Sequence, residues 1–431
     1  MKTLNLKPGD LVSLKTKEKT WEGNVLESHD PEIVLLKLVS GYNIGIRENR
    51  VLSAEVLEEA GAQNTPELKL EKNKELPNIA MIITGGTISS RLDPKSGAVK
   101  WTSVEDLFKI APELTNICNI VEIKKPFMKG SEDMSLKYWK KIAEAAVKIL
   151  NDKKIDGLII THGTDTLHYG AAALGFFLKD LSKPVAFTYS QRSIDRGSTD
   201  AHLNMICAAK YATSEIAEVA IVGHKDLNDN ICVALPATKT KKSHTSRRDA
   251  FQVVNDTPIA EISKEHLEIL KDFKVKDILK KTELDAKSMD KVVLIKVTPG
   301  MSPDVLNFYA REGYKGIVLE TTGLGHVPGR NSENNWLPTI KKLVKKGIVI
   351  CATAQTIYGS LNPNVYSTGR ELKTTGITFL KDMLPETALI KLSWALGHPS
   401  WARDKDKVKN KMLENIAGEY NDKLGVEGFG C

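Results

Sequence analysis

At 431 residues the chain is long enough for two or three domains of about 150 residues, each with its own hydrophobic core. Its composition of 41% hydrophobic and 27% charged residues is that of a folded globular protein and excludes the disordered, collagen-like and fibrous classes. The net charge of +7 is a mild basic excess. It favours contact with a polyanion without establishing it, because a lysine-rich solvated surface explains it equally well.

The spacing of the cysteines and the length of the apolar runs indicate the cellular compartment of the protein. Five cysteines are scattered without a C-x-x-C spacing, and their odd number indicates reduced thiols rather than a disulfide framework or a zinc site. No metal site is therefore predicted. The N-terminus lacks the apolar stretch of a signal peptide, and no uncharged apolar run reaches about 18 residues. These features predict a cytoplasmic protein that does not enter a membrane.

The first part of the chain, residues 1–57, alternates short β-branched runs with turn residues. The runs occupy residues 10–16, 20–28, 32–38 and 42–57. Asp, Pro and Gly lie between them, a pattern that predicts a small antiparallel β-barrel. Residues 58–77 are polar and charged with little periodicity. We expect a linker there, either a tether or a weak edge element.

From residue 78 onwards, continuous aliphatic runs are followed by helical periods, which predicts parallel sheets covered by helices on both faces. The expected strands of a first α/β unit, residues 78–285, lie at 78–84, 156–161, 184–189 and 218–223. Those of a second α/β unit, residues 286–431, begin at Lys291, Gly316 and Gly347. Between them, residues 303–313 and 336–346 are expected to form crossover helices.

Two further stretches are expected to be helical. Residues 259–290 are rich in Lys, Glu and Leu, which predicts an exposed helical linker or insertion between the two α/β units. The end of the chain predicts two amphipathic helices, at 382–397 and 404–425, the second more polar. The last helix is either a docking element for a partner or a solvated terminal helix.

Polar residues gather where the expected strands of the first α/β unit end. One strand runs into TGGTI (84–88), whose paired glycines allow a sharp turn and a close backbone approach, and another runs into THGTDT (161–166). Each motif alone has a structural alternative, a glycine turn in the first and an N-cap at Thr166 in the second. A third loop, KSHTSRRDAF (242–251), reads by itself as a solvated basic loop.

The residue types in these loops fit acyl transfer. A threonine hydroxyl is a poor nucleophile until a neighbouring base activates it, and the tetrahedral intermediate needs N–H donors, which glycine-rich strand ends supply. A lysine beside a carboxylate and a threonine acts as a proton shuttle if burial lowers its pKa. We assign that role to Lys242, oriented by Asp165.

The motifs TGGTI, HGTDT and KSHTSRRDAF, in that order, resemble the bacterial-type asparaginase/glutaminase family over about residues 78–400. The resemblance implies that Thr87 is one nucleophile candidate and that Thr164, Asp165 and Lys242 form a second triad. It also implies substrate binding by Ser131 and Glu132, in a GSEDM segment similar to the family's Gly-Ser-Gln-Asp-Met, together with Gly86 and Gly163. Which threonine forms the acyl-enzyme stays open.

One departure from this family concerns the loop after TGGTI, where the family usually places a tyrosine that helps to activate the threonine. Residues 89–100 contain no aromatic residue, and Trp101 is not an obvious substitute. The absence of this tyrosine is compatible with an inactive enzyme, with a site completed by a partner, or with a different activation of the Thr87 hydroxyl. We favour completion by a partner, because conformational completion on binding restrains hydrolysis until its product is used.

The N-terminal module and HTSRRDAF resemble the archaeal GatD family of glutamyl-tRNA(Gln) amidotransferase subunits, as do three other segments. These begin at Ser190, Leu319 and Tyr366. The resemblance implies a homodimer core within a heterotetramer with the partner GatE. The partner uses ATP and Mg²⁺, and the tRNA(Gln) carrying Glu is bound mostly through it. This chain itself is expected to bind no cofactor. The alternatives are a stand-alone cytoplasmic L-asparaginase, which leaves residues 1–76 unexplained, and a non-catalytic binding module.

Overall fold

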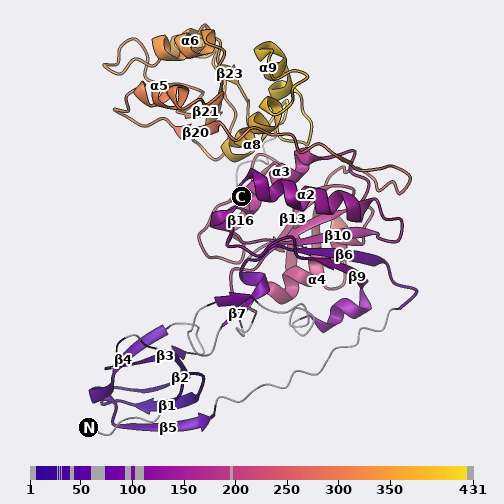
Figure 1. The fold of residues 1–431 in the computed structure, drawn as a ribbon, viewed down its shortest axis with the longest axis vertical. Coiled ribbons are helices and arrows are strands. Elements are labelled where there is room, and N and C mark those ends of the chain that lie inside the picture. The colour runs from indigo at the N-terminus through magenta and orange to yellow at the C-terminus, as the bar shows by residue number, and fades with distance from the viewer. Residues whose placement is uncertain are drawn as a thin grey trace.

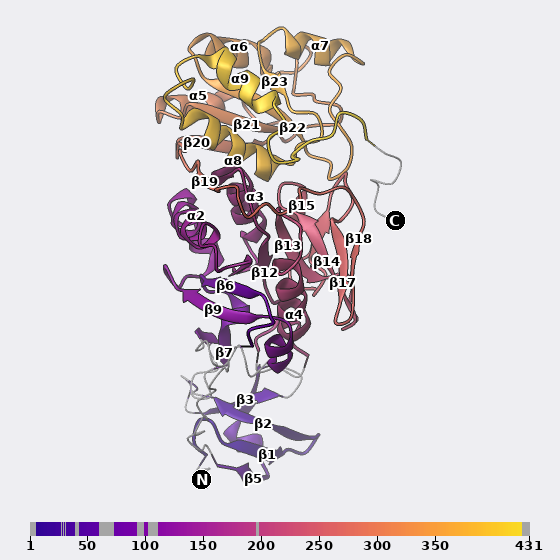
Figure 2. The same cartoon turned by 90° about the vertical axis from the view of Figure 1, so that its right-hand side faces the viewer.

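The computed structural model describes residues 6–26, 28, 30, 32–38, 43–59, 73–92, 99–101, 111–194 and 198–424. Three sections follow one another along the long axis of the molecule: an N-terminal β-sheet, a large α/β lobe and a smaller C-terminal α/β lobe (Figures 1 and 2). Most of the predicted linker, residues 60–72, lies outside the described residues. No helix in the described ranges is both long and apolar enough to span a bilayer.

The N-terminal section is a five-stranded antiparallel sheet with the order β4-β3-β2-β1-β5. Its strands are β1 (Leu11–Lys15), β2 (Thr20–Leu26), β3 (Ile33–Leu38), β4 (Asn43–Arg47) and β5 (Ser53–Glu58). Alternate side chains of β1, Val12 and Leu14, are fully buried, as expected for a strand with one face on a core. This core is a hydrophobic cluster of its own. The predicted antiparallel β-module is confirmed, with β4 and β5 as its edge strands.

The large lobe contains an eight-stranded sheet with the order β18-β17-β14-β13-β12-β10-β6-β9. Five strands are parallel: β6 (Asn78–Ile83), β9 (Asn119–Lys124), β10 (Gly157–Thr161), β12 (Val185–Thr188) and β13 (Val219–His224). Three antiparallel strands follow: β14 (Ile231–Pro236), β17 (Ala260–Ser263) and β18 (Leu267–Ile269). The four strands predicted in this lobe are confirmed.

Both faces of this sheet are covered by helices, which explains its continuous apolar strands. Helices α2 (Leu136–Leu150) and α3 (Leu167–Phe177) share one hydrophobic cluster with Ala80 and Ile82 of β6. Helix α4 (Ala201–Ala212) shares another with Ile79 and Met81 of the same strand. Successive side chains of β6 therefore enter different layers.

The C-terminal lobe has a four-stranded parallel sheet, ordered β20-β21-β22-β23. Its strands are β20 (Val292–Lys296), β21 (Gly316–Thr321), β22 (Val349–Ala354) and β23 (Thr378–Phe379). Its helices are α5 (Asp304–Arg311), α6 (Leu337–Lys345), α7 (Ser367–Lys373), α8 (Pro385–Leu396) and α9 (Lys405–Leu413). The strands and the two crossover helices predicted here, α5 and α6, are confirmed.

Three short two-stranded ribbons lie outside the larger sheets. They pair β7 (Ser90–Leu92) with β8 (Val99–Trp101), β11 (Leu178–Lys179) with β19 (Glu283–Leu284), and β15 (Thr240–Lys242) with β16 (Phe251–Val253). Four cysteines, Cys118, Cys207, Cys232 and Cys351, are free and buried, which confirms the prediction of reduced thiols for them. Cys431 lies outside the described residues.

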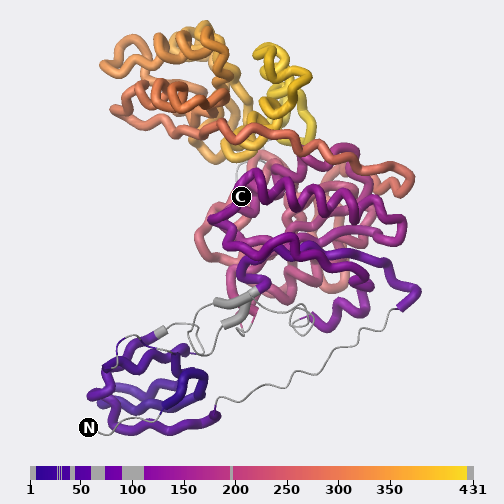
Figure 3. The backbone as a smooth tube through the Cα atoms, in the orientation of Figure 1, coloured from indigo at the N-terminus to yellow at the C-terminus, as the bar shows by residue number. Residues whose placement is uncertain are grey.

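The prediction of a helical linker at 259–290 is wrong. The stretch contains β17, β18 and β19 and otherwise irregular backbone, which passes along the seam between the two α/β lobes (Figure 3). Pairing of β17 with β14 satisfies its backbone groups, and such tertiary pairing overrides a local preference for helix. Further on, the amide of Met289 donates to Ser393 O of α8, so the segment joins the lobes.

The two C-terminal helices also differ from expectation. Helix α8 is buried along almost its whole length rather than amphipathic, because it lies between α3 and strand β21. Helix α9 ends at Leu413 instead of continuing to residue 425. Beyond it the chain turns around Glu419, whose fully buried carboxylate forms an ion pair with Lys391 of α8 and accepts from the Ile416 and Ala417 amides.

Candidate active site

The first two predicted motifs follow the neighbouring parallel strands β6 and β10. Hydrogen bonds join the two motifs where the strands end. Both the amide and the hydroxyl of Thr84 donate to the carbonyl of Thr161, at 3.3 and 2.8 Å. The hydroxyl groups of Ser89 and Thr161 are 3.2 Å apart. Since the carboxyl ends of parallel strands meet at one sheet edge, the polar residues that follow are held side by side.

Glycines let the two motif loops touch. Gly86 has a φ of 84°, in the left-handed region that favours glycine, and a Cβ atom there would lie 2.5 Å from the Gly163 nitrogen. A Cβ atom at Gly163 would in turn lie 2.7 Å from both Cβ and Oγ of Ser131. Three chain segments therefore converge with no room for a methyl group between them.

Lys242 connects the third motif to the second. Its Nζ donates to Oγ1 of Thr164 at 2.9 Å and to Oδ1 of Asp165 at 2.8 Å. The lysine side chain is 12% exposed, whereas that of Asp165 is 60% exposed. Strand β15 supplies Lys242, and its cross-strand neighbour Phe251 is buried. The predicted constellation of Thr164, Asp165 and Lys242 is thus brought together.

Ser131 contacts the loop that carries Thr164 and Asp165. It is 3% exposed; its hydroxyl accepts from the amide of Asp165 at 3.0 Å, and its carbonyl accepts from the hydroxyl of Thr166 at 2.7 Å. Thr166 occupies the predicted N-cap position of α3, yet its side chain makes no capping hydrogen bond to that helix. Its contact with Ser131 leaves no local sequence signal, because the two residues lie in different loops. Glu132 is exposed beside Gly130.

Thr87 begins the 3₁₀ turn Thr87–Ser89, directly after the Gly86–Gly163 contact. It is partly buried, and the following Ile88 is fully buried, which fixes the turn. Most of the loop in which the family tyrosine was sought lies outside the described residues and side chains. Completion of the site by a partner therefore stays a prediction.

His162 is a further buried member of this region. Its Nδ1 lies 2.7 Å from the carbonyl of Gly163. Burial lowers the pKa of His162 to about 4, so the imidazole is neutral at physiological pH. It supports the second motif loop without adding a charge to it.

The basic segment after Lys242 is exposed at residues 243–247, as expected of a solvated loop, and Arg248 anchors its end. The Arg248 guanidinium, 11% exposed, donates to Asp229 at 2.8 Å and to the carbonyls of Leu227 and Ser198 at 3.1 and 2.7 Å. Arg247 forms two bonds to Asp249, at 2.8 and 2.7 Å. Arg248 thus joins the third motif to the loop after β13 and to the loop before α4. This role is visible only in the folded structure, because the bonded residues are far apart in the sequence.

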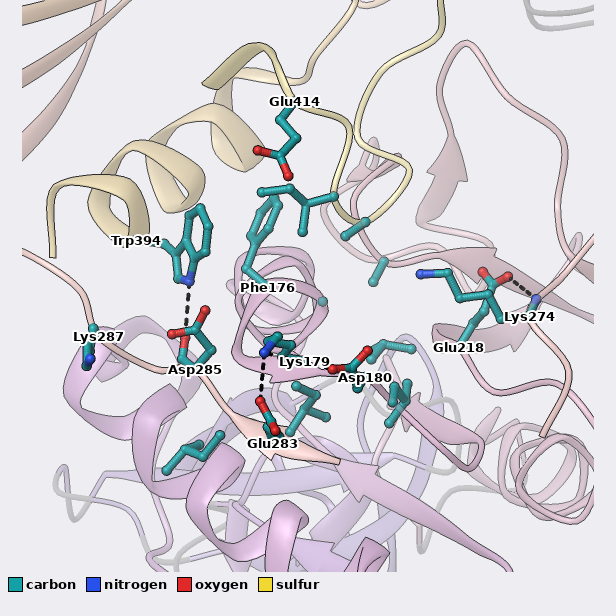
Figure 4. A pocket seen from close by; sticks show the side chains of 18 of the residues that line it. Phe176, Lys179, Asp180, Glu218, Lys274, Glu283, Asp285, Lys287, Trp394 and Glu414 are labelled. Carbon is teal, nitrogen blue, oxygen red and sulfur yellow. Dashed lines mark hydrogen bonds and ion pairs between the residues drawn. The ribbon is translucent and has the colours of Figure 1, made fainter. Parts of the chain in front are cut away.

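A cavity of about 800 Å³ opens elsewhere on the seam between the lobes, and none of the predicted site residues lines it (Figure 4). Charged side chains around it already pair, for example Lys179 with Glu283 at 2.7 Å. The candidate chemistry lies at the motif loops instead. No group of three or more His, Cys, Asp or Glu residues within the described part of the chain is placed to hold a metal ion.

Comparison with known proteins first defines the class. Residues 78–274 match the family described as Asparaginase, N-terminal, and residues 291–412 match Glutaminase/Asparaginase C-terminal domain. The solved thermostable L-asparaginase from Thermococcus kodakarensis superposes with a TM-score of 0.71 at 28% identity, covering 80% of this chain and 100% of that chain. Fold and motif loops thus define an α/β amidohydrolase of the asparaginase class.

The N-terminal module narrows the assignment, since residues 6–57 match the GatD N-terminal domain. The glutamyl-tRNA(Gln) amidotransferase protein GatD of Thermococcus kodakarensis is 44% identical, covering 98% of this chain and 96% of that protein. The protein of the same name from Pyrococcus abyssi is also 44% identical, covering 97% and 96%. The chain belongs to the GatD family of glutamyl-tRNA(Gln) amidotransferase subunits.

Proposed function

We propose that this chain is the amide-hydrolysing subunit of a Glu-tRNA(Gln) amidotransferase. It releases ammonia from the side chain of Gln or Asn and supplies it to a partner protein. The observation that carries the proposal is the position of Lys242 Nζ, within hydrogen-bond distance of both Thr164 and Asp165. A threonine hydroxyl, an amine that accepts its proton and an orienting carboxylate are the parts that a threonine nucleophile requires.

The reaction has two half-reactions. A threonine Oγ attacks the amide carbon, its proton passes to the amine of Lys242, and the resulting oxyanion is stabilised by backbone N–H groups of the glycine loops. Collapse expels ammonia with the returned proton and leaves an acyl ester on the threonine. Water then hydrolyses the ester to the free acid. Thr87 and Thr164 are both candidates for the nucleophile.

Substrate recognition is assigned to the residues around this centre. Asp165, with its exposed carboxylate, pairs with the substrate α-ammonium, Ser131 holds the α-carboxylate, and Glu132 is a further substrate-binding residue. The close contact between Gly86 and Gly163 supports this assignment, because it leaves backbone N–H groups rather than side chains at the sheet edge.

The proposed partner is the amidotransferase protein GatE, which would convert Glu-tRNA(Gln) to Gln-tRNA(Gln) with ATP and Mg²⁺ held at the partner. The assembly would be a homodimer of this chain with two GatE chains attached, a heterotetramer in the cytoplasm. The mild basic excess of the chain supports a position near the tRNA backbone, without base recognition.

Ammonia release measured with the chain alone, then with GatE, then with GatE and Glu-tRNA(Gln), tests this function. Stimulation at both additions is expected. Asparagine hydrolysis at full rate by the chain alone, with no co-purifying partner protein, would instead identify a stand-alone asparaginase. Absence of ammonia under all three conditions would identify a non-catalytic binding module.

A further inference from the structure

The segment that leads into and carries Lys242 contacts the C-terminal part of the chain through Thr238, Lys239 and Lys241. The hydroxyl of Thr387 in α8 donates to the Thr238 carbonyl at 2.8 Å, and the Thr238 hydroxyl donates to the Ala417 carbonyl, also at 2.8 Å. Lys239 forms a fully buried ion pair with Asp382 at 2.5 Å. The segment entering β15 therefore belongs to the large lobe in sequence but is fixed by the smaller one.

Lys241, the residue before Lys242, continues these contacts. Its Nζ forms an ion pair with Oε1 of Glu386, in the first turn of α8. Successive side chains of a strand point to opposite faces. Lys241 thus reaches the C-terminal lobe while Lys242, next to it, reaches Thr164 on the other side.

Glu386 is mostly buried, and Lys241 is the cation that it contacts by a hydrogen bond. Its side chain is 12% exposed, and Oε2 has no hydrogen-bond partner among the described residues. Nearby His168 of α3 is neutral at physiological pH, since burial lowers its pKa to about 4. Burial raises the pKa of Glu320 on β21, and the charge of Glu386 raises it further. Loss of Lys241 would leave a mostly buried carboxylate without its hydrogen-bonded cation.

We propose that the Lys241–Glu386 ion pair is a positioning device, through which the C-terminal lobe sets the location of the Lys242 amine against Thr164. Both residues act through Lys242. The inference deepens the proposed function and rests on it for its effect on turnover. A small displacement of a proton-transfer group is sufficient to lower the rate strongly, because the geometry of transfer is narrow.

The test compares Lys241→Met and Glu386→Gln with Lys241→Arg, which keeps the cation. Lys179→Met is the matched control, because it removes an exposed lysine–glutamate pair in the same lobe. The kcat for ammonia release should fall about tenfold or more in the first two variants with little change in KM, and Lys241→Arg should restore most of it. The control should keep the wild-type kcat.

A second measurement does not depend on activity. The rate at which acetic anhydride labels the Lys242 amine, followed by mass spectrometry, should rise several-fold in Lys241→Met and Glu386→Gln as the amine leaves Thr164 and Asp165. Wild-type labelling in both variants would overturn the inference, as would failure of Lys241→Arg to restore the wild-type rate. If Lys241→Met does not fold, the nearly isosteric Glu386→Gln carries the same test. A wild-type protein that releases no ammonia would overturn the proposed function, while the labelling would still decide the positioning role.

Discussion

The Nζ atom of Lys242 lies 2.9 Å from Oγ1 of Thr164, although 78 positions separate the two residues in the chain. The ribbon formed by β15 and β16 brings the lysine to the carboxyl end of β10, and Asp165 holds its other side at 2.8 Å. This contact joins two motifs that each have a purely structural explanation when taken alone. In the proposed function they supply a candidate nucleophile, a base and an orienting group.

Replacing Lys242 tests the proton transfer directly. Lys242→Ala should lower kcat for ammonia release by about 10²–10⁴-fold, the usual contribution of a positioned general base. Lys242→Arg should be similarly inactive, because guanidinium does not lose its proton in proteins. Steady-state ammonia assays measure both. An arginine variant with more than half of the wild-type kcat would rule out a proton-accepting role.

The contact between the motif loops predicts an intolerance of methyl groups. Gly86→Ala should place Cβ against the backbone of Gly163 and should destabilise the protein by about 1–3 kcal/mol, with a large loss of activity. Gly329→Ala is the matched control, since a Cβ atom there meets nothing within 4 Å. Urea unfolding and ammonia assays should separate the two variants; equal stability of both would contradict the packing described.

The buried histidines predict how stability depends on pH. Burial lowers the pKa of His162 and of His168 to about 4, below the ordinary value of 6.5. As the pH falls from 6.5 towards 4, the unfolded chain therefore takes up protons that the folded chain does not, and the free energy of unfolding decreases. The slope should reach up to about 1.4 kcal/mol per pH unit for each histidine.

Substitution of one of these histidines checks the source of that slope. His168→Phe keeps a ring against Tyr169 and Phe251 but removes one titrating group, so the decrease between pH 6.5 and 4 should be shallower than in the wild type. Urea unfolding across this pH range measures the difference. The explanation fails if the two proteins show the same slope.

The ion pair between Lys239 and Asp382 predicts a strong effect of removing one partner. Both side chains are fully buried, so Lys239→Met should lower the free energy of unfolding by about 3–5 kcal/mol. The exposed pair between Lys381 and Asp422 serves as the control, and Lys381→Met should cost less than about 1 kcal/mol. Similar values for the two substitutions in urea unfolding would contradict this ranking.

The sequence revealed those features of the fold that depend on local patterns. Strands such as β6 were visible because both faces are covered, which makes their residues continuously apolar. The meeting of Lys242 with Thr164 and Asp165 followed from motif order together with a family resemblance. The helix predicted at 259–290 is wrong, since residues 260–263 pair with β14, a tertiary contact that local composition does not encode. The burial of α8 was missed because it is created by packing between two lobes.

The convergence of Gly86, Gly163 and Ser131 has a consequence for how such a protein changes over time. Because a single methyl group cannot enter between these segments, a substitution in one is tolerated only if the others move with it. The three loops, although distant in the sequence, should therefore change together during evolution, as one block. Variation in donor preference should then arise at residues bordering that block, such as the exposed Glu132, rather than within it.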